Sequence, residues 1–476
     1  PDFSDVTVHE DDKNVEQFVS LFAKAVHKGR NRKAFTPGDV PNEVWRILLE
    51  PQWLLPTVKF RWGIGHEGLF PTPTKFDQMF RSLVATMFAT KCLPVQAVCN
   101  NGVTIHQKNM SMDDPTQATE GTRTIHVYSA FTQNLIKVCQ KHAQVRQVSS
   151  SEFGAIKHRR REEAIAIQLF NAEMCTRNSY SYLTKFFDVK NAFYCPTHAE
   201  IAVCYDKCAS PYCDFFSQVV QNQFAIVSCA DGVVVLNPET GVPPGLTCAT
   251  DFFNEVYSRG LDDYYKATHD VTFIFDVSSI LDGQTINAAS TTFVDDVATS
   301  VASDLPQDLI KDADHITQQL DHALAKLNMK QNLTKAASIA QCRGPGAHKQ
   351  YQVLKSSTHA GLTKSARYLG PHLHWMGLAT VEVGRRITCA WAAWHMYRRF
   401  WSIQTSKKFR KNVFMAAVVS VLISGMTVFV LTEQNENKLA TVYYRMVRKL
   451  AKGKACYKET DEFGNVVSYK SITNAQ

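Results

Sequence analysis

The pattern of hydrophobic and polar positions predicts β-strands most clearly within residues 183–194 and 271–298. The stretches LTKFFDVKNAF, VTFIFDVSS and TTFVDDVA are rich in β-branched and aromatic residues, and each contains aspartate. A helix is expected after the last of them, because Ser303 or Asp304 can cap it and Pro306 suits its first turn. Its predicted buried positions recur at helical spacing, at Leu309, Ala313, Ile316, Leu320, Ala323 and Leu327.

Helices and strands also alternate earlier in the chain. Residues 1–70 are predicted to be mostly helical, residues 75–92 form a helical run, and GTRTIHVYSA (121–130) has the pattern of a strand. Residues 151–180 contain a strongly charged helix candidate, HRRREEAIAIQLFNAEMC, with apolar positions Ala164, Ile165, Ile167, Leu169 and Phe170. This mixture of elements predicts an α/β or α+β fold.

The composition suits a folded protein with a polyanionic partner. Hydrophobic residues make up 45% of the chain and charged residues 20%, which excludes a chain that is disordered throughout. The formal net charge is +8. Residues 383–432 hold no acidic residue, although they include Arg385, Arg386, Arg398, Arg399, Lys407, Lys408, Arg410 and Lys411. This basic stripe indicates a nucleic-acid or anionic-membrane surface, or otherwise a solvated helix face.

Cellular location and a membrane anchor are the next questions that the sequence raises. The 13 cysteines follow no disulfide-scaffold spacing, and the first residues show no signal-peptide pattern, so we expect an intracellular protein. Residues 413–431 form 19 positions without a charge, which is long enough for a membrane-spanning helix. Gly425 and many β-branched residues favour a buried helix instead. No membrane partner is expected, and a membrane-anchored protein remains the alternative.

Two adjacent aspartates, Asp295 and Asp296, are the main candidate for chemistry. Neighbouring carboxylates repel each other and lose hydration when buried, unless a divalent cation neutralises them. Mg²⁺ takes one or two carboxylates together with substrate phosphates. Asp188, at the end of another predicted strand, could complete a centre for two Mg²⁺ ions. Asp276 in FIFDVSS has the same pattern and competes with Asp188.

The order of these motifs resembles that of reverse transcriptases, most closely those of non-LTR (LINE-like) retrotransposons. The resemblance runs from about Pro71 to about Lys454. FFDVKNAF, GVPPGLTCATDFFN and FVDD are similar to the first three palm motifs, and LNMKQNLTKAASI and ARYLG to the fourth and fifth, the last being the primer grip. HQKN, GTRTI and EFGAIKHRRREEAI resemble motifs of the fingers, and VVSVLISGMTVFVLTEQNENKLATVYYRMVRKL resembles the thumb.

The resemblance implies an α+β fold of the right-hand polymerase type, with an antiparallel palm sheet backed by helices. Its expected domains are an N-terminal extension (1–70), fingers (71–180), a palm that ends in the primer grip (181–370), a basic helical thumb (371–455) and a tail (456–476). The implied function is RNA-directed DNA polymerisation for retrotransposon integration in the nucleus. The implied partners are an RNA template, a DNA primer and deoxynucleoside triphosphates.

The resemblance also implies a role for each candidate residue. Asp188, Asp295 and Asp296 would bind two Mg²⁺ ions, and Lys335 would act as an acid toward the leaving group. The incoming nucleotide would be held by Lys108, Arg123, Phe193, Gly241 and Gly245. In these roles the ring of Phe193 would disfavour a 2′-hydroxyl, and the glycines would let the backbone approach closely.

Some positions depart from the family pattern. Pro244 stands where the family usually has glutamine, Thr124 follows Arg123 where it usually has proline, and Glu152 replaces a glutamine. Two interpretations therefore stay open. One is a working, divergent enzyme, and the other is a decayed copy that binds nucleic acid without polymerising.

Overall fold

A computed structural model describes residues 13–29, 40–49, 73–106, 122–143, 149–229, 232–278, 280, 283–356, 361–403, 405–451 and 456–471. The fold is α+β, with one mixed and one antiparallel four-stranded sheet. The chain divides into two compact units, each assembled from several segments. Unit 1 contains 1–149, 190–263 and 322–330, and unit 2 contains 150–189, 264–321 and 331–476.

Unit 1 is a helical layer around a small mixed sheet. Its helices are α1 (Lys13–Lys28), α2 (Asn42–Leu49), α4 (Pro73–Thr90), α5 (Val95–Val98), α7 (Ala130–Cys139), η2 (Ala192–Tyr194), α9 (His198–Ala202), α10 (Tyr212–Gln221) and most of α11 (Ala249–Ala267). The strands are β1 (Cys99–His106), β2 (Thr122–Tyr128), β4 (Phe224–Cys229) and β5 (Gly232–Leu236), in the order β2-β1-β4-β5. A core rich in aromatic rings, including Phe22, Phe80 and Phe215, holds the helices together.

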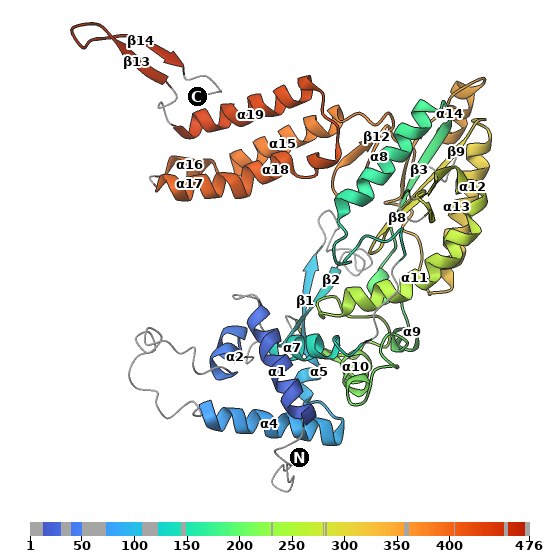
Figure 1. Cartoon of the computed structure of the whole chain (residues 1–476), viewed down its shortest axis with the longest axis vertical. Helices are drawn as coiled ribbons and strands as arrows, with labels where there is room; N and C mark the ends of the chain where they lie inside the picture. The colour runs from blue at the N-terminus through green and yellow to red at the C-terminus, as the bar shows by residue number, and fades with distance from the viewer. Residues whose placement is uncertain are drawn as a thin grey trace. The chain divides into compact units, whose positions relative to one another are not determined.

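Unit 2 is built on a four-stranded antiparallel sheet in the order β10-β3-β9-β8. Its strands are β3 (Ser181–Phe187), β8 (Ser290–Phe293), β9 (Asp296–Ser303) and β10 (Ala337–Gln341). Every residue of β3 is buried, because both faces of the sheet are covered. Neighbouring side chains of β3 point to opposite faces. On one face Thr184 connects through Ser300 to helix α8 (Arg161–Arg177), and on the other Lys185 bonds Thr317 of α13 (Asp308–Ala325). Figure 1 shows both helices beside this sheet.

The remaining elements of unit 2 lie around this sheet and after it. They are α12 (His269–Thr272), η3 (Phe273–Phe275), β6 (Asp276–Ser278), β7 (Thr285–Asn287), α14 (Ala347–Ser356), β11 (Ser365–Arg367), β12 (His372–His374), α15 (Thr380–Met396), α16 (Arg398–Ser402), α17 (Lys407–Phe414), η4 (Met415–Val419), α18 (Ser420–Ile423), η5 (Met426–Val428), α19 (Glu433–Ala451), β13 (Cys456–Thr460) and β14 (Val466–Ser471). In Figure 1 α15, α17, α18 and α19 form one helical group. Its core includes Trp394, Trp401 and Met446.

Several predicted elements need correction. VTFIFDVSS is not one strand, because it covers the end of α12, a 3₁₀ turn and the three-residue strand β6. After Asp296 strand β9 continues to Ser303, so the next helix starts at Asp308 rather than at Ser303, Asp304 or Pro306. The buried spacing of that helix is confirmed at Leu309, Ala313, Ile316, Leu320 and Ala323, which are all buried. It is wrong for Leu327, which lies beyond the last helical residue, Ala325, and is only partly buried.

The uncharged segment 413–431 forms the end of α17, a π-helical turn, α18 and a 3₁₀ turn. Among the described residues, one helical stretch, Lys407–Val428, is long and apolar enough to span a membrane. Of its most apolar 18 residues, 33% are buried. Phe414, Val418 and Leu422 pack into the core of the helical group. A core helix passes the same length and composition test, so this segment is weak evidence for an anchor.

Candidate functional site

Two strand ends bring the candidate aspartates together in unit 2. Asp188 follows the last residue of β3, Asp295 lies in the two-residue turn between β8 and β9, and Asp296 is the first residue of β9. Strands β3 and β9 are antiparallel neighbours, with Phe187 opposite Val297. The carboxylates therefore project from adjacent ends of two paired strands. We refer to Asp188, Asp295 and Asp296 as the carboxylate site.

Asp188 is held in place by the segment that follows α13. The side-chain amide of Asn332 donates to Asp188 Oδ2 at 2.9 Å, and the Asn332 backbone N–H donates to the Asp188 carbonyl at 2.7 Å. Lys335 Nζ forms an ion pair with Asp188 Oδ2 at 3.3 Å. The structure thus places the predicted Lys335 at the predicted Asp188. Asn332 belongs to the motif LNMKQNLTKAASI but had no predicted role of its own. Its side chain lies closer to the Asp188 carboxylate than that of Lys335 does.

The surroundings of Asp296 disfavour its ionised form. Burial, together with the neighbouring carboxylates Asp295 and Asp188, raises the pKa of Asp296 from its ordinary value of 3.8 to about 7. Lys335 and Arg367 act in the opposite direction but do not offset this effect. Arg367 lies in the predicted primer grip ARYLG, so that motif also contributes charge to the site.

The turn that carries Asp295 is strained and tightly packed. Val294 has φ +61°, which is unfavourable for a β-branched residue. A Cβ on Gly154 would lie 2.3 Å from the Val294 backbone nitrogen, so only glycine fits against the turn. The preceding residues run beside β8, where Phe153 N–H donates to the Thr292 carbonyl at 2.8 Å. The predicted fingers segment EFG therefore packs against the aspartate hairpin itself.

A buried hydrogen-bond network supports the hairpin from α8. The hub is Gln168, which is 2% exposed and accepts from Ser300 Oγ at 2.8 Å while donating to Thr291 Oγ1 at 3.0 Å. Thr291 in turn bonds the hydroxyl of Tyr368 at 2.8 Å. Burial raises the pKa of Tyr368, so it stays a neutral hydrogen-bonding group. The network ties β8, β9, α8 and the primer grip into one rigid support.

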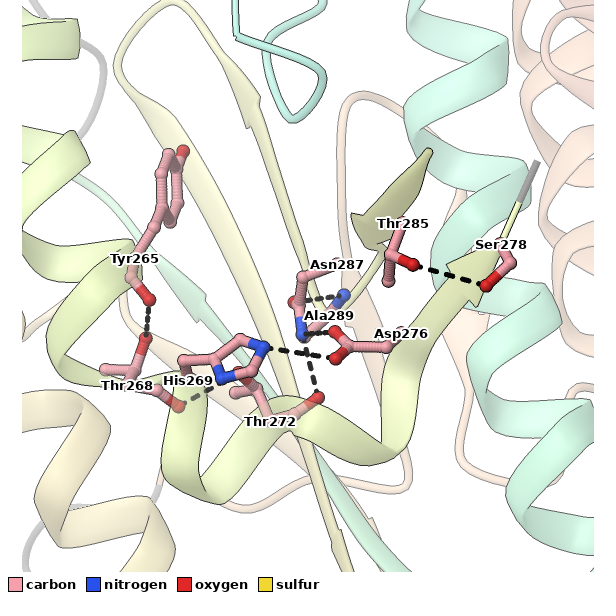
Figure 2. Close-up of polar contacts among 9 residues, drawn as sticks. All are labelled: Tyr265, Thr268, His269, Thr272, Asp276, Ser278, Thr285, Asn287 and Ala289. Carbon is pink, nitrogen blue, oxygen red and sulfur yellow. Dashed lines mark hydrogen bonds and ion pairs between the residues drawn. The ribbon is translucent and has the colours of Figure 1, made fainter. Parts of the chain in front are cut away.

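The competing aspartate, Asp276, has different surroundings (Figure 2). His269 Nε2 lies 3.1 Å from Asp276 Oδ2, and Asn287 Nδ2 donates to Asp276 Oδ1 at 2.7 Å. Asn287 also donates to the Thr272 carbonyl and accepts from the Ala289 N–H. Asp276 therefore closes the β6–β7 hairpin onto α12, which is a structural role for this carboxylate.

The carboxylate site has the donor chemistry that a divalent cation requires. Asp295 and Asp188 lie close enough to Asp296 to help raise its pKa, and a bound divalent cation would relieve that repulsion. Within the described part of the chain no group of three or more His, Cys, Asp and Glu side chains has a geometry ready to hold a metal ion. The residues fit Mg²⁺ by type and charge, and the two-ion centre stays a prediction.

Other candidate residues gather in unit 1, around the turn of residues 241–247, which we call the glycine turn. The Gly241 and Val242 N–H groups donate to the carbonyls of Pro196 and Phe193 at 2.7 and 2.8 Å. Gly241 has φ +87°, and its added Cβ would lie 2.6 Å from the Tyr194 Cα. Its close backbone contact is therefore with the chain itself.

Strand β2 covers the other end of the glycine turn. The His126 N–H donates to the Pro244 carbonyl at 3.3 Å. Gly245 has φ +114°, and its added Cβ would lie 2.1 Å from the His126 carbonyl oxygen. Both predicted glycines are thus required by packing within unit 1. Whether they also approach a nucleotide stays a prediction.

The other predicted nucleotide-binding residues are Phe193, Arg123 and Lys108. Phe193 stacks on Phe253 with ring centroids 4.7 Å apart. Arg123 lies on β2 opposite Ile105, and Lys108 lies outside the described residues. The structure therefore brings Phe193, the glycine turn and the strand of Arg123 into one unit, and Asp188, Asp295, Asp296 and Lys335 into the other.

The basic stripe is less uniform than its sequence. Glu382 is fully buried and accepts from Arg385 Nε at 2.8 Å and from Arg386 Nε at 2.5 Å. Arg385 also donates to the Gly370 carbonyl of the primer grip at 2.9 Å. These two arginines therefore have a structural role. The exposed members of the stripe are Arg398, Arg399, Lys407, Lys408 and Lys411.

Comparison with known proteins leaves the family open. No protein-family model and no curated protein matches the chain. Among solved structures, telomerases resemble it weakly.

Apo telomerase of Candida tropicalis has 12% identity and a TM-score of 0.39 over 93% of this chain and 96% of that chain. Its form truncated from the C-terminal domain has 13% identity and a TM-score of 0.39 over 64% of this chain and 60% of that chain. Telomerase of Candida albicans, in complex with a fragment of telomeric RNA, has 9% identity and a TM-score of 0.42 over 79% and 68%.

Proposed function

We propose that this chain is an RNA-directed DNA polymerase, the reverse transcriptase portion of a non-LTR retrotransposon, with fingers, palm and thumb. The observation that carries the proposal is the carboxylate site: Asp188 and the Asp295–Asp296 pair come from motifs about a hundred residues apart and meet at adjacent strand ends. The antiparallel sheet with helices on both faces is consistent with the palm of such a polymerase. The exposed lysines and arginines of the basic stripe would contact the template–primer backbone.

The proposed reaction joins a deoxynucleotide to a primer. The primer 3′-oxygen forms a bond to the α-phosphorus of the triphosphate, the bond from that phosphorus to the bridging oxygen breaks, and pyrophosphate leaves. The hydroxyl proton passes to water. Asp188, Asp295 and Asp296 would hold Mg²⁺, which would lower the pKa of the hydroxyl and neutralise the leaving phosphates. Lys335, held beside Asp188, would donate a proton to the pyrophosphate.

Primer extension tests the proposal. The purified chain is given an RNA template, a DNA primer, Mg²⁺ and deoxynucleotides, beside a variant in which Asp295→Ala and Asp296→Ala are combined. We expect extension by the natural chain and a loss of about a thousandfold or more in the variant. Binding of the template–primer should change less than about twofold, because the cationic contacts lie elsewhere.

The same assay decides between the proposal and a decayed copy. If neither protein extends the primer while both bind it in a salt-sensitive manner, the chain binds nucleic acid without polymerising. The departure at Pro244 motivates that alternative. Pro244→Gln then provides a direct comparison, since recovery of extension would identify the proline as a lesion.

A further inference from the structure

The glycine turn is held differently at its two ends. At its start, two consecutive backbone N–H groups, from Gly241 and Val242, donate to carbonyls of the segment after β3. Farther along, Pro243 and Pro244 have no N–H to donate, so the chain cannot continue that pattern. The second half of the turn has one internal bond, from the Leu246 N–H to the Pro243 carbonyl at 3.2 Å, and its other carbonyls take donors from elsewhere.

The side chain of Gln133 supplies such a donor. Its Nε2 donates to the Gly245 carbonyl at 2.6 Å, and its Oε1 accepts from the Thr247 hydroxyl. One amide thus bonds the turn on both sides of Leu246. Both hydrogen-bonding ends of the amide are used, which fixes its orientation as well as its position.

Gln133 is presented by a rigid element. It lies in the first turn of α7, where Ser129 caps the helix by accepting from the Thr132 N–H at 3.0 Å. The buried Thr132 hydroxyl donates to the Ala97 carbonyl at 2.9 Å and anchors α7 to α5. The Gln133 N–H itself donates to the Ser129 carbonyl at 3.0 Å. The amide therefore approaches the turn from a fixed base.

We infer that Gln133 is a positioning residue that sets the conformation of the second half of the glycine turn and so the binding of the incoming nucleotide. The conformational part stands on the contacts alone. The nucleotide part rests on the proposed polymerase function. A double proline turn next to a positive-φ glycine leaves few internal restraints, so an external amide gives the turn one defined shape.

Amide hydrogen exchange tests the conformational part without any activity. In Gln133→Ala, the amides of His126 and Leu246, which donate to the carbonyls of Pro244 and Pro243, should exchange at least about threefold faster. The amides of Gly241 and Val242 should not change, because their acceptors are backbone carbonyls at the other end of the turn. Unchanged exchange at His126 and Leu246 would overturn the inference, whether or not the chain is a polymerase.

Gln140 provides a matched control near the end of the same helix. Its side chain donates to Asp251 Oδ2 at 2.8 Å, in the first turn of α11, and forms no hydrogen bond with the glycine turn in the part of the chain that the structure describes. Gln140→Ala should leave exchange in the glycine turn unchanged. A similar acceleration in both variants would show a general loosening of α7 and would count against a specific role for Gln133.

Kinetics test the nucleotide part. Gln133→Ala should raise the KM for deoxynucleotides about tenfold through loss of two hydrogen bonds, with less than about twofold change in template–primer binding. Thr247→Val should give part of that effect and add little to Gln133→Ala, because both remove the same interaction. If the natural chain extends no primer, the proposed function fails while the exchange result stands. If it extends primers and KM is unchanged in Gln133→Ala, the inference is wrong for the nucleotide.

Discussion

The carboxylate site of unit 2 and the glycine turn of unit 1 are built by different means. At the carboxylate site the side chains carry the arrangement: Asp188 is held by Asn332 and Lys335, and Asp296 is half-buried among other charges. At the glycine turn backbone groups carry it, with one side chain, Gln133, added from a separate helix. The first region concentrates charge, and the second concentrates restricted backbone conformation.

This difference determines what each region tolerates. Buried carboxylates lower the free energy of unfolding unless a cation or hydrogen-bond donors offset their lost hydration. A positive-φ glycine in contact with another backbone causes no steric clash until a side chain is added. We therefore expect substitutions at the carboxylate site to remove chemistry while sparing the fold. Substitutions at the glycine turn should instead destabilise the fold.

The largest effect is expected at Asp188. Asp188→Asn keeps a partner for Asn332 but removes a charge, so primer extension should fall about a thousandfold or more. Asp276→Asn is the matched control, because Asp276 had the same sequence pattern but bonds His269 and Asn287 in a structural hairpin. It should change extension by less than about twofold. Equal losses in single-turnover extension by both variants would remove the distinction between the two aspartates.

Gly245→Ala should have the largest effect on stability. The added Cβ would lie 2.1 Å from the His126 carbonyl oxygen at φ +114°, so unfolding free energy should fall by at least about 2 kcal/mol in urea titrations. Gly384→Ala, in α15, has no atom within 4 Å of the added Cβ and should raise stability by about 0.5–1 kcal/mol. A neutral Gly245→Ala would mean that the turn moves freely from β2.

Elements were predictable from the sequence where the spacing of apolar and polar residues agrees with the buried and exposed faces of the element. Periodic Leu309, Ile316 and Leu320 predicted the buried face of α13, because one apolar face packs on the sheet. Strand ends were also predictable where aspartate interrupts an apolar run, as at Asp188. The stretch around Asp276 has equal β-propensity, yet tertiary contacts make most of it helical turns.

Helix α8 shows why the rest could not be predicted. Phe170 is one of the apolar positions of this helix, but its side chain is 59% exposed, whereas the polar Gln168 is 2% exposed. The sheet presents hydroxyls of Ser300 and Thr291 to this helix, and a buried hydroxyl needs a polar partner. Such partners come from distant segments, as Gln133 does for the glycine turn, so no local pattern marks them.

The smallest expected effect concerns the pH dependence of stability at Asp296. Its folded pKa of about 7 exceeds the ordinary 3.8, so the unfolded chain releases this proton first as pH rises. Asp296 therefore does not lower the free energy of unfolding below about pH 4, and its destabilising effect grows until about pH 7. Asp296→Asn removes that effect, so its melting temperature relative to the natural chain should be higher at pH 8 than at pH 4.5, by about 2 °C or more.

Mg²⁺ sharpens this last prediction. If the carboxylate site binds the cation, Mg²⁺ at pH 8 should raise the melting temperature of the natural chain more than that of Asp296→Asn. The readout needs no polymerase activity, so it separates cation binding from catalysis. A stability difference that is the same at both pH values would show that Asp296 is not buried among like charges. An equal Mg²⁺ effect on both proteins would place cation binding elsewhere, and the carboxylate site would then lose its proposed role.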